Sequence, residues 1–488
     1  MSFSNLKIVA SGSITAFIGR FIGTALNYFY SILLARYLGV RLMGVFFLGI
    51  TILNILSSFV MLGLDQSLLK FVSISLSQSN YTKAKKLIVF SIKIILIFSI
   101  ILGVFLFLFK KTLSIYIFHD EVLNTVFVFI AIILPIFSLY TLLSETLKAF
   151  KKIALVVFSQ NFIFPVITIL TFLGLYFLGL RLKAALMAYL IGSLVTVFLI
   201  VHFYKMLLIK EDMKNVIINK KELFSVSIPV YWVSIMTIFM WWTDIIMLGI
   251  FETPKEIGIY TAATKTAAFV AFFLMAVNYI LPPIVAQLYS KRELNELELL
   301  VRRTARWNLI FSLLVTSIFF LFGKEILSLY GKEFTLAYIP LLLLSFGQII
   351  NAGVGSVGYI LVMTGFQNKL VYISSAAAIL NVILNAILIS LFSIKGAALA
   401  TGITLIVWNL TAAYFVYKDV KIKAFSDSFM KIIIGVFLIV LVSLLIKKFI
   451  GLWGCMVVFL LISLFATFKI FLDNADIFLV KTIINRSV

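Results

Sequence analysis

Charged side chains interrupt stretches of this sequence that are otherwise strongly apolar. The cations are Arg20, Lys93 and Lys265, and the anions are Asp65 and Asp244. A charge placed in hydrocarbon costs at least ~3 kcal/mol on insertion scales, so we expect each side chain to face protein or a water-filled cavity. The cations outnumber the anions. This excess suits a phosphate group, because arginine forms bidentate hydrogen bonds to phosphate oxygens and lysine attracts them as a point charge.

Polar residues recur at helical spacing around several of these charges. The stripes and faces are Ser13, Arg20, Thr24, Asn27 and Ser31; Asn54, Ser58 and Asp65; Ser234, Thr237, Trp241 and Asp244; and Thr261, Lys265, Phe272 and Tyr279. Residues three or four apart lie on one face of a helix. The spacing therefore predicts a polar cavity inside a membrane bundle. The residues that we expect to bind a substrate there are Arg20, Asn27, Trp241 and Lys265.

A structural interpretation of the same residues is also open. Arg20 would then pair with Asp65 only to hold two helices together. Asp244 would pair with Lys265 for the same reason. Trp241 stacks on a sugar ring or a cation in the functional interpretation, and anchors its helix at the membrane interface in the structural one.

The composition is that of a membrane protein. The chain has 488 residues, of which 63% are hydrophobic and 12% charged, and its mean hydropathy is +1.17. Soluble domains of this length are far less apolar, so we expect a polytopic membrane protein. The formal net charge is +22. In so apolar a chain this charge indicates lysines and arginines beside anionic lipid on the cytoplasmic side, and no nucleic-acid partner.

Fourteen apolar runs are long enough to span a bilayer, and they predict an all-α polytopic membrane protein. They lie near residues 11–36, 42–69, 87–109, 122–147, 153–179, 183–205, 225–250, 258–289, 304–322, 336–363, 369–392, 396–417, 428–449 and 452–472. Lysines and arginines are about twice as frequent on one side of this arrangement as on the other, which places both termini in the cytoplasm.

The two halves of the chain are related by an internal repeat. At an offset of about 214 residues, Gly44 before Phe46 corresponds to Gly258 before Tyr260. An even number of spans in each half makes this repeat parallel, which favours two six-helix bundles around a central cleft. We expect four parts: a bundle in 1–208, a cytoplasmic connector in 209–224, a second bundle in 225–418, and two extra helices with a C-terminal tail in 419–488.

The sequence contains no motif for chemical catalysis. A phosphate-binding glycine loop is missing, and His119 and His202 stand far apart without metal-ligand spacing. Cys455 is the single cysteine, which excludes an internal disulfide or a cysteine metal cluster. We therefore expect a protein that is not an enzyme and has no metal or cofactor. Its work would be driven by a gradient of protons or sodium, by the membrane potential or by the gradient of its own substrate.

Three segments resemble a known family: ILLARYLGVRLMGVFFLGITI, DIIMLGIFETPKEIGIYTAATK and TGFQNKL…NVILNAILISLFSIKGAALATGIT. They are similar to the polysaccharide-repeat (O-antigen, Wzx-type) flippases, whose superfamily also contains lipid II flippases and multidrug and toxin extrusion transporters. The resemblance implies two six-helix bundles that form a V and alternate access in a prokaryotic plasma membrane. It also implies a substrate class, undecaprenyl-diphosphate-linked oligosaccharides moved from the cytoplasmic to the outer leaflet.

The resemblance extends to individual positions of this chain. Cationic cavity residues are thought to hold the diphosphate in the family, and Arg20 and Lys265 fit that role. In the lipid II branch two additional C-terminal helices form a groove for the lipid tail, and the two apolar spans within 419–488 match them. We further expect Asp65 and Asp244 to form an ion-coupling or gating pair.

We therefore expect a flippase for a polyprenyl-diphosphate-linked oligosaccharide, with membrane lipid and glycan-assembly enzymes as its partners. One rival is an organic-cation or drug antiporter of the same fold, although a cation site would favour an excess of buried carboxylates. A second rival is a membrane polymerase or glycosyltransferase of glycan assembly. Such enzymes usually need a sizeable loop or domain, and this chain has none. A structural scaffold, the remaining alternative, would not need buried charges.

Overall fold

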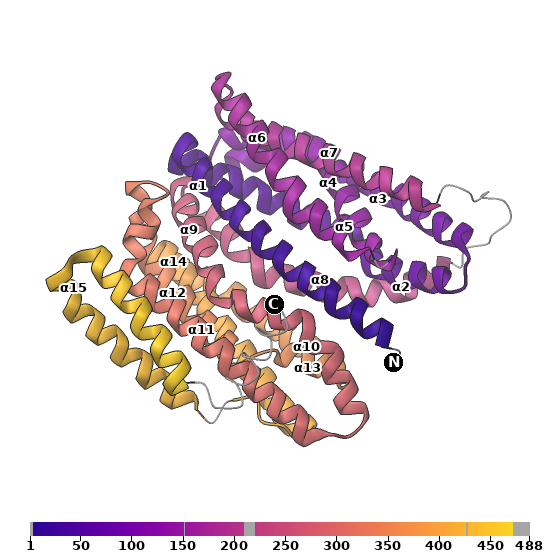
Figure 1. Ribbon diagram of the computed structural model, residues 1–488. Coiled ribbons are helices and arrows are strands. Elements are labelled where there is room, and N and C mark those ends of the chain that lie inside the picture. The colour runs from indigo at the N-terminus through magenta and orange to yellow at the C-terminus, as the bar shows by residue number, and fades with distance from the viewer. Residues whose placement is uncertain (1–2, 151, 209–219, 426–427, 472–488) are drawn as a thin grey trace. The chain divides into compact units, whose positions relative to one another are not determined.

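The computed structural model describes residues 3–150, 152–208, 220–425 and 428–471. These residues form helices joined by short turns, and no strand occurs among them (Figure 1). The predicted all-α polytopic fold is therefore confirmed. Most of the predicted connector, residues 209–219, and the predicted tail from 472 onward lie outside the described residues.

The α-helices follow one another with these bounds: α1 (Phe3–Met61), α2 (Leu64–Ser77), α3 (Tyr81–Thr112), α4 (Val122–Leu147), α5 (Ile153–Phe158), α6 (Phe164–Phe177), α7 (Arg181–Leu208), α8 (Lys220–Phe251), α9 (Pro254–Ala267), α10 (Phe272–Ser290), α11 (Leu294–Ser328), α12 (Tyr338–Val354), α13 (Val357–Met363), α14 (Gln367–Phe415) and α15 (Phe429–Ala466). Short π-helical or 3-10 turns join or extend them at Leu113–Ile117, Lys148–Phe150, Ser159–Ile163, Ala268–Ala271, Lys332–Ala337, Val416–Val420 and Thr467–Phe471.

Within the described residues, 12 helical segments are long and apolar enough to cross a membrane. Ile18–Met61 has 44 residues and Gln367–Val420 has 54, whereas about 20 residues cross a bilayer. Each contains one residue with positive φ, Gly39 (78°) and Ser393 (52°) respectively, where two helices meet. If both segments cross twice, the crossings number fourteen. The lengths agree with the predicted count, which stays a prediction.

The predicted spans lie close to the observed helices, and the run 122–147 coincides with α4. The stripe that ends at Asp65 is an exception. Leu62 (φ 49°) and Gly63 (φ 72°) separate α1 from α2, and Asp65 lies in the first turn of α2. Asp65 therefore does not continue the helical face of Asn54, and the predicted common stripe is wrong because the helix is broken between them.

Contacts divide the chain into two compact units. The first contains Met1–Ala262, Ser328–Ala337 and Ser374–Ala400, and the second contains Ala263–Leu327, Tyr338–Ile373 and Thr401–Val488. Helix α14 thus contributes to both units. The four parts predicted above follow the sequence repeat, whereas these two units follow the contacts between residues. The four-part division therefore stays a prediction.

Glycines allow close helix approach within each unit. In the first unit, a Cβ on Gly44 of α1 would lie 1.7 Å from the carbonyl oxygen of Pro254, and a Cβ on Gly258 of α9 would lie 2.2 Å from that of Val40. In the second unit, a Cβ on Gly347 of α12 would lie 2.8 Å from the backbone of α14. Small residues at such crossings let helix backbones approach closely, as is typical of membrane bundles.

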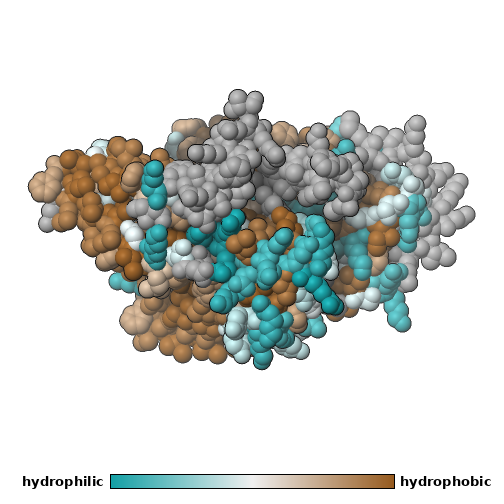
Figure 2. Space-filling model, turned by 60° about the horizontal axis from the view of Figure 1, so that its bottom comes forward, coloured by the Kyte–Doolittle hydropathy of each residue, from teal (hydrophilic) through white to brown (hydrophobic). Residues whose placement is uncertain are grey.

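Large apolar side chains cover the outside of both units. Examples are Ile97, Ile101, Phe105 and Leu108 on α3, and Phe437, Leu445, Phe449 and Trp453 on α15. Figure 2 shows extensive hydrophobic areas in brown beside hydrophilic side chains in teal. Soluble monomers rarely expose contiguous apolar surface of this kind, whereas a surrounding bilayer accommodates it.

Candidate functional site

A buried carboxylate and a buried phenol are in contact in the first unit. The hydroxyl of Tyr260 donates to Oδ2 of Asp244 at 2.6 Å, and the backbone N–H of Ile245 donates to Oδ1 at 2.8 Å. Asp244 is 6% exposed and Tyr260 is fully buried. A carboxylate in the interior needs donors of this kind, because leaving it unpaired is costly. The contact holds an ionisable group in a fixed place inside the bundle.

The local sequence explains how α8 and α9 bring these residues together. Glu252 and Thr253 form a tight connection, and Pro254 occupies the first position of α9, where a missing N–H costs nothing. The Thr253 hydroxyl donates to the carboxylate of Glu256. Gly258 then lets α9 press against the backbone of α1. Tyr260 follows two residues later and reaches back to α8.

The corresponding pair in the first repeat has different chemistry. At the repeat offset Tyr30 corresponds to Asp244, and Phe46 to Tyr260. Tyr30 and Phe46 also meet, edge to face, with ring centroids 6.3 Å apart. The Tyr30 hydroxyl is buried without a hydrogen-bond partner among the described residues. The fold thus repeats the contact, but only the second copy contains a carboxylate.

The residues predicted to bind substrate differ in how exposed their side chains are and in the unit to which they belong. Arg20 and Asn27 are exposed on α1, and the Asn27 amide donates to the Gly23 carbonyl at 2.8 Å. Trp241 on α8 is 49% exposed, although Asp244 one turn later is buried. Lys265 on α9 is partly buried and belongs to the second unit. The joint action of these residues on a substrate stays a prediction.

Asp65 and Asp244 have separate hydrogen-bond partners. Asp65 is partly buried and accepts from the Gln66 amide at 3.3 Å, whereas Asp244 accepts from Tyr260 and Ile245. Their action as a coupling or gating pair stays a prediction. Among the described residues, no group of three or more His, Cys, Asp or Glu side chains could hold a metal ion.

The profile of a family described as polysaccharide biosynthesis protein matches residues 9–289, which is more than half of the chain. The chain belongs to the polysaccharide biosynthesis protein family. The predicted resemblance is confirmed. The MatE profile matches residues 229–387 of this family member. A probable low-salt glycan biosynthesis flippase, Agl15 of Haloferax volcanii, is 28% identical over 474 residues, covering 93% of this chain and 96% of its own.

Solved structures show that this polysaccharide biosynthesis protein shares its fold with transporters. A lipid II flippase MurJ in an inward closed conformation has a TM-score of 0.75 at 14% identity, with 94% of this chain and 98% of that chain covered. An inward-facing multidrug resistance MATE family transporter of the MOP superfamily has a TM-score of 0.64 at 15% identity, with 84% and 98% covered. The two predicted bundles, residues 1–418, make up about 86% of the chain. Because the match to MurJ covers 94% of the chain, it extends into the C-terminal helices.

Sequence reasoning on this family member missed two buried polar residues. Tyr260 was noted only as the counterpart of Phe46, because its partner on α8 cannot be seen in a pattern of consecutive residues. Arg306 on α11 is also missing from the sequence-based candidates, although it is only 8% exposed. Its neighbour Ala305 is buried too, and the apolar spacing from Val301 onward was the available signal.

Proposed function

We propose that the protein is a flippase that moves a polyprenyl-diphosphate-linked oligosaccharide from the cytoplasmic to the outer leaflet of a prokaryotic plasma membrane. The observation that carries this proposal is the similarity to the glycan biosynthesis flippase of Haloferax volcanii, which runs through 93% of the chain. The family match over residues 9–289 supports the same substrate class. Both termini lie in the cytoplasm in this proposal, and glycan-assembly enzymes supply the substrate and use the product.

The proposed mechanism keeps the polar headgroup away from hydrocarbon. A diphosphate is strongly hydrated, and burying its charge in lipid is far too costly for unassisted transfer. The headgroup therefore enters a hydrated cleft while the polyprenyl tail stays in the bilayer. The cations Arg20 and Lys265 bind the diphosphate, and the exposed Asn27 and Trp241 contact the sugars. Alternating access then carries the headgroup across, and no covalent bond is made or broken.

We assign the coupling to an ion gradient, of protons or of sodium. The support for this step is the buried contact of Asp244 with Tyr260, because a carboxylate held in the interior can gain and lose a cation during the transport cycle. Asp65 acts with it as a gate. The ion would bias the two access states through its different affinity for each, which is what coupling requires.

A second function, an organic-cation or drug antiporter, is favoured by one observation, the match of the MatE profile to residues 229–387. The two functions are separated by a transport experiment. The purified chain is placed in proteoliposomes with a fluorescent polyprenyl-diphosphate-oligosaccharide, with and without an imposed proton or sodium gradient. Gradient-dependent loss of signal to an outside quencher is the expected result. Uptake of an organic cation without lipid movement would instead establish the antiporter.

A further inference from the structure

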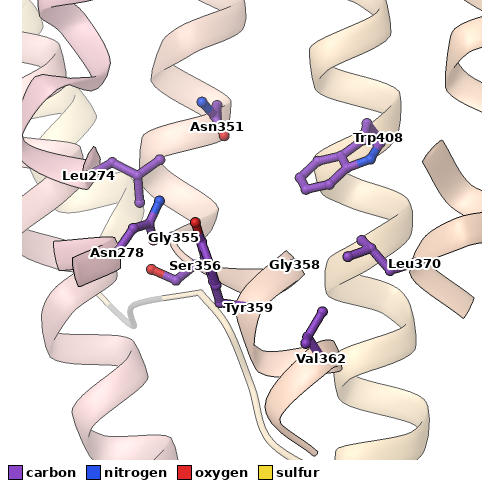
Figure 3. Close-up of a pocket in the computed structure, with 10 residues that line it drawn as sticks. All are labelled: Leu274, Asn278, Asn351, Gly355, Ser356, Gly358, Tyr359, Val362, Leu370 and Trp408. Carbon is purple, nitrogen blue, oxygen red and sulfur yellow. The ribbon is translucent and has the colours of Figure 1, made fainter. Parts of the chain in front are cut away.

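A neutral pocket of about 200 Å³ lies inside the second unit, lined by residues of α10, α12, α13 and α14 (Figure 3). Its polar side chains are Asn278, Asn351, Ser356, Tyr359 and Trp408, and the remaining lining is aliphatic or glycine. None of its ten lining residues is charged. In Figure 3 the polar groups of Asn278 and Ser356 lie on one side, and the indole of Trp408 stands on the other.

A break in a membrane helix builds this pocket. Gly355, with φ 80°, separates α12 from α13, and Val357 N–H bonds to the Gly355 carbonyl at 3.0 Å instead of continuing the helix. Irregular backbone at membrane depth is tolerated where it is buried in protein or lines a cavity. Gly358 has a second role, because a Cβ there would lie 2.9 Å from the Trp408 ring. The indole therefore rests directly on the backbone of α13.

Two buried polar atoms of this pocket make no hydrogen bond within the described part of the chain. They are Oγ of Ser356, a residue only 6% exposed, and Oδ1 of Asn278. Nearly all buried polar atoms in proteins are paired, so two unpaired atoms on residues that line one pocket lack the partners that such atoms normally have. A ligand hydroxyl would pair with either atom once its side chain turns toward the pocket, donating to the Asn278 amide oxygen or accepting from the Ser356 hydroxyl.

We propose that this pocket binds one neutral sugar ring of the glycan, an inference that rests on the proposed function. Trp408 and Tyr359 offer aromatic surface to the apolar face of the ring, while the amides and hydroxyls receive its hydroxyl groups. The absence of lysine and arginine among the lining residues disfavours the diphosphate. The volume lies below the roughly 300–1,000 Å³ of pockets for drug-sized ligands, which suits a single ring.

Two walls of the pocket are fixed by packing against the hydrophobic core. Trp408 and Leu370 pack against the hydrophobic core of the second unit, to which Val357 and Ile360 of α13 belong. Groups that must recognise a ligand work best when packing holds them in place. Trp408 is therefore preorganised for binding the sugar.

Binding of two lipids to the full chain in nanodiscs tests this inference. The probes are a fluorescent polyprenyl diphosphate with a neutral trisaccharide and the same lipid without sugar. The wild-type chain is expected to bind the glycan lipid more tightly. Trp408→Ala is expected to reduce this preference about tenfold, which corresponds to 1.4 kcal/mol, and Trp408→Phe to retain most of it. The matched control is Trp453→Ala, which removes a 76% exposed tryptophan of α15.

Ser356→Ala separates recognition from folding. It removes an unpartnered hydroxyl, so the melting temperature is expected not to fall, while the preference for the glycan lipid decreases. The control Ser345→Ala removes a buried hydroxyl that bonds to the Leu341 carbonyl, and is expected to leave the preference unchanged. Equal weakening of both lipids by Trp408→Ala, or a preference that survives both pocket variants, would overturn the sugar site.

The test distinguishes this site from the proposed function. If the wild-type protein flips the glycan lipid in proteoliposomes but binds both lipids equally, the proposed function stands and the sugar site is refuted. If it shows a pocket-dependent preference for the sugar but no flipping, the sugar site stands and the proposed function is refuted.

Discussion

Gly44 and Gly258, which correspond to each other in the internal repeat, pack against one another's helices. A Cβ on Gly44 would lie 1.7 Å from the Pro254 carbonyl oxygen and 2.8 Å from the backbone nitrogen of Gly258 itself. A Cβ on Gly258 would lie 2.2 Å from the Val40 carbonyl oxygen. The same glycine of both repeats thus makes one mutual contact in the first unit. It holds the start of α9 on α1, two residues before Tyr260.

Gly258→Ala is expected to destabilise the folded chain, because its methyl group meets a backbone atom that cannot move aside. Overpacking of this kind costs about 1–3 kcal/mol. Gly174→Ala is the control, since a Cβ on that residue of α6 has no atom within 4 Å. Thermal unfolding in nanodiscs measures both variants. Equal melting temperatures for the two would show that the contact is not tight.

Tyr260→Phe is expected to lower stability by about 1–3 kcal/mol, because it takes a donor from a buried carboxylate. Tyr176→Phe removes a hydrogen bond to the uncharged Tyr37 carbonyl, so its cost should be smaller, about 0.5–1.5 kcal/mol. Thermal unfolding compares the two. A Tyr260→Phe chain as stable as wild type would mean that the Asp244 carboxylate does not depend on this phenol.

Asp244→Asn is expected to remove the gradient dependence of flipping while preserving the fold. The amide keeps the shape: its oxygen can accept from the Ile245 N–H while its NH2 donates to the Tyr260 hydroxyl, but it carries no charge to exchange a cation. Initial flipping rates with and without a proton or sodium gradient check this. The control is Asp120→Asn, which alters a buried aspartate that pairs with Arg41 at 2.8 Å. Gradient dependence should persist in that control, and its persistence in Asp244→Asn would refute the coupling role.

Arg20→Ala is expected to reduce flipping by at least about 30-fold, since truncating a charge that pairs with a phosphate costs ~2 kcal/mol or more. Arg20→Lys should retain part of the activity. Arg36→Ala serves as the control on the same helix, because the Arg36 guanidinium donates to the carbonyls of Ser328 and Leu329. Lys265→Ala is expected to behave as Arg20→Ala does. Full activity of both alanine variants, with normal yields of folded protein, would remove the diphosphate clamp.

Cysteine labelling tests the predicted orientation. Cys455 is buried and is the single cysteine, so Cys455→Ser provides a clean background. Gln78→Cys is placed after α2 and Glu121→Cys before α4, both at exposed positions on opposite predicted sides. An impermeant maleimide is expected to label the second variant in intact cells and the first only after permeabilisation. The reverse pattern would invert the topology.

The sequence by itself determined where the apolar helices lie, the family, and the charged residues proposed to bind the diphosphate and to couple the gradient. The run 122–147 coincides with α4, because the length of an apolar run is a property of consecutive residues. Asp244 was found for the same reason, as a charge inside such a run. The repeat also identified Gly44 and Gly258 as counterparts, although it did not show that they meet.

The tertiary structure alone decided which of these residues meet. The donor to Asp244 lies on the next helix, and Asp65 is separated from α1 by Leu62 and Gly63. Ser356 lines a cavity at the point where α12 is broken. Periodicity describes which face of one helix a residue occupies, but not what a second helix places opposite it. That outcome depends on close backbone approach and on local breaks, which arise from contacts between residues far apart in the chain.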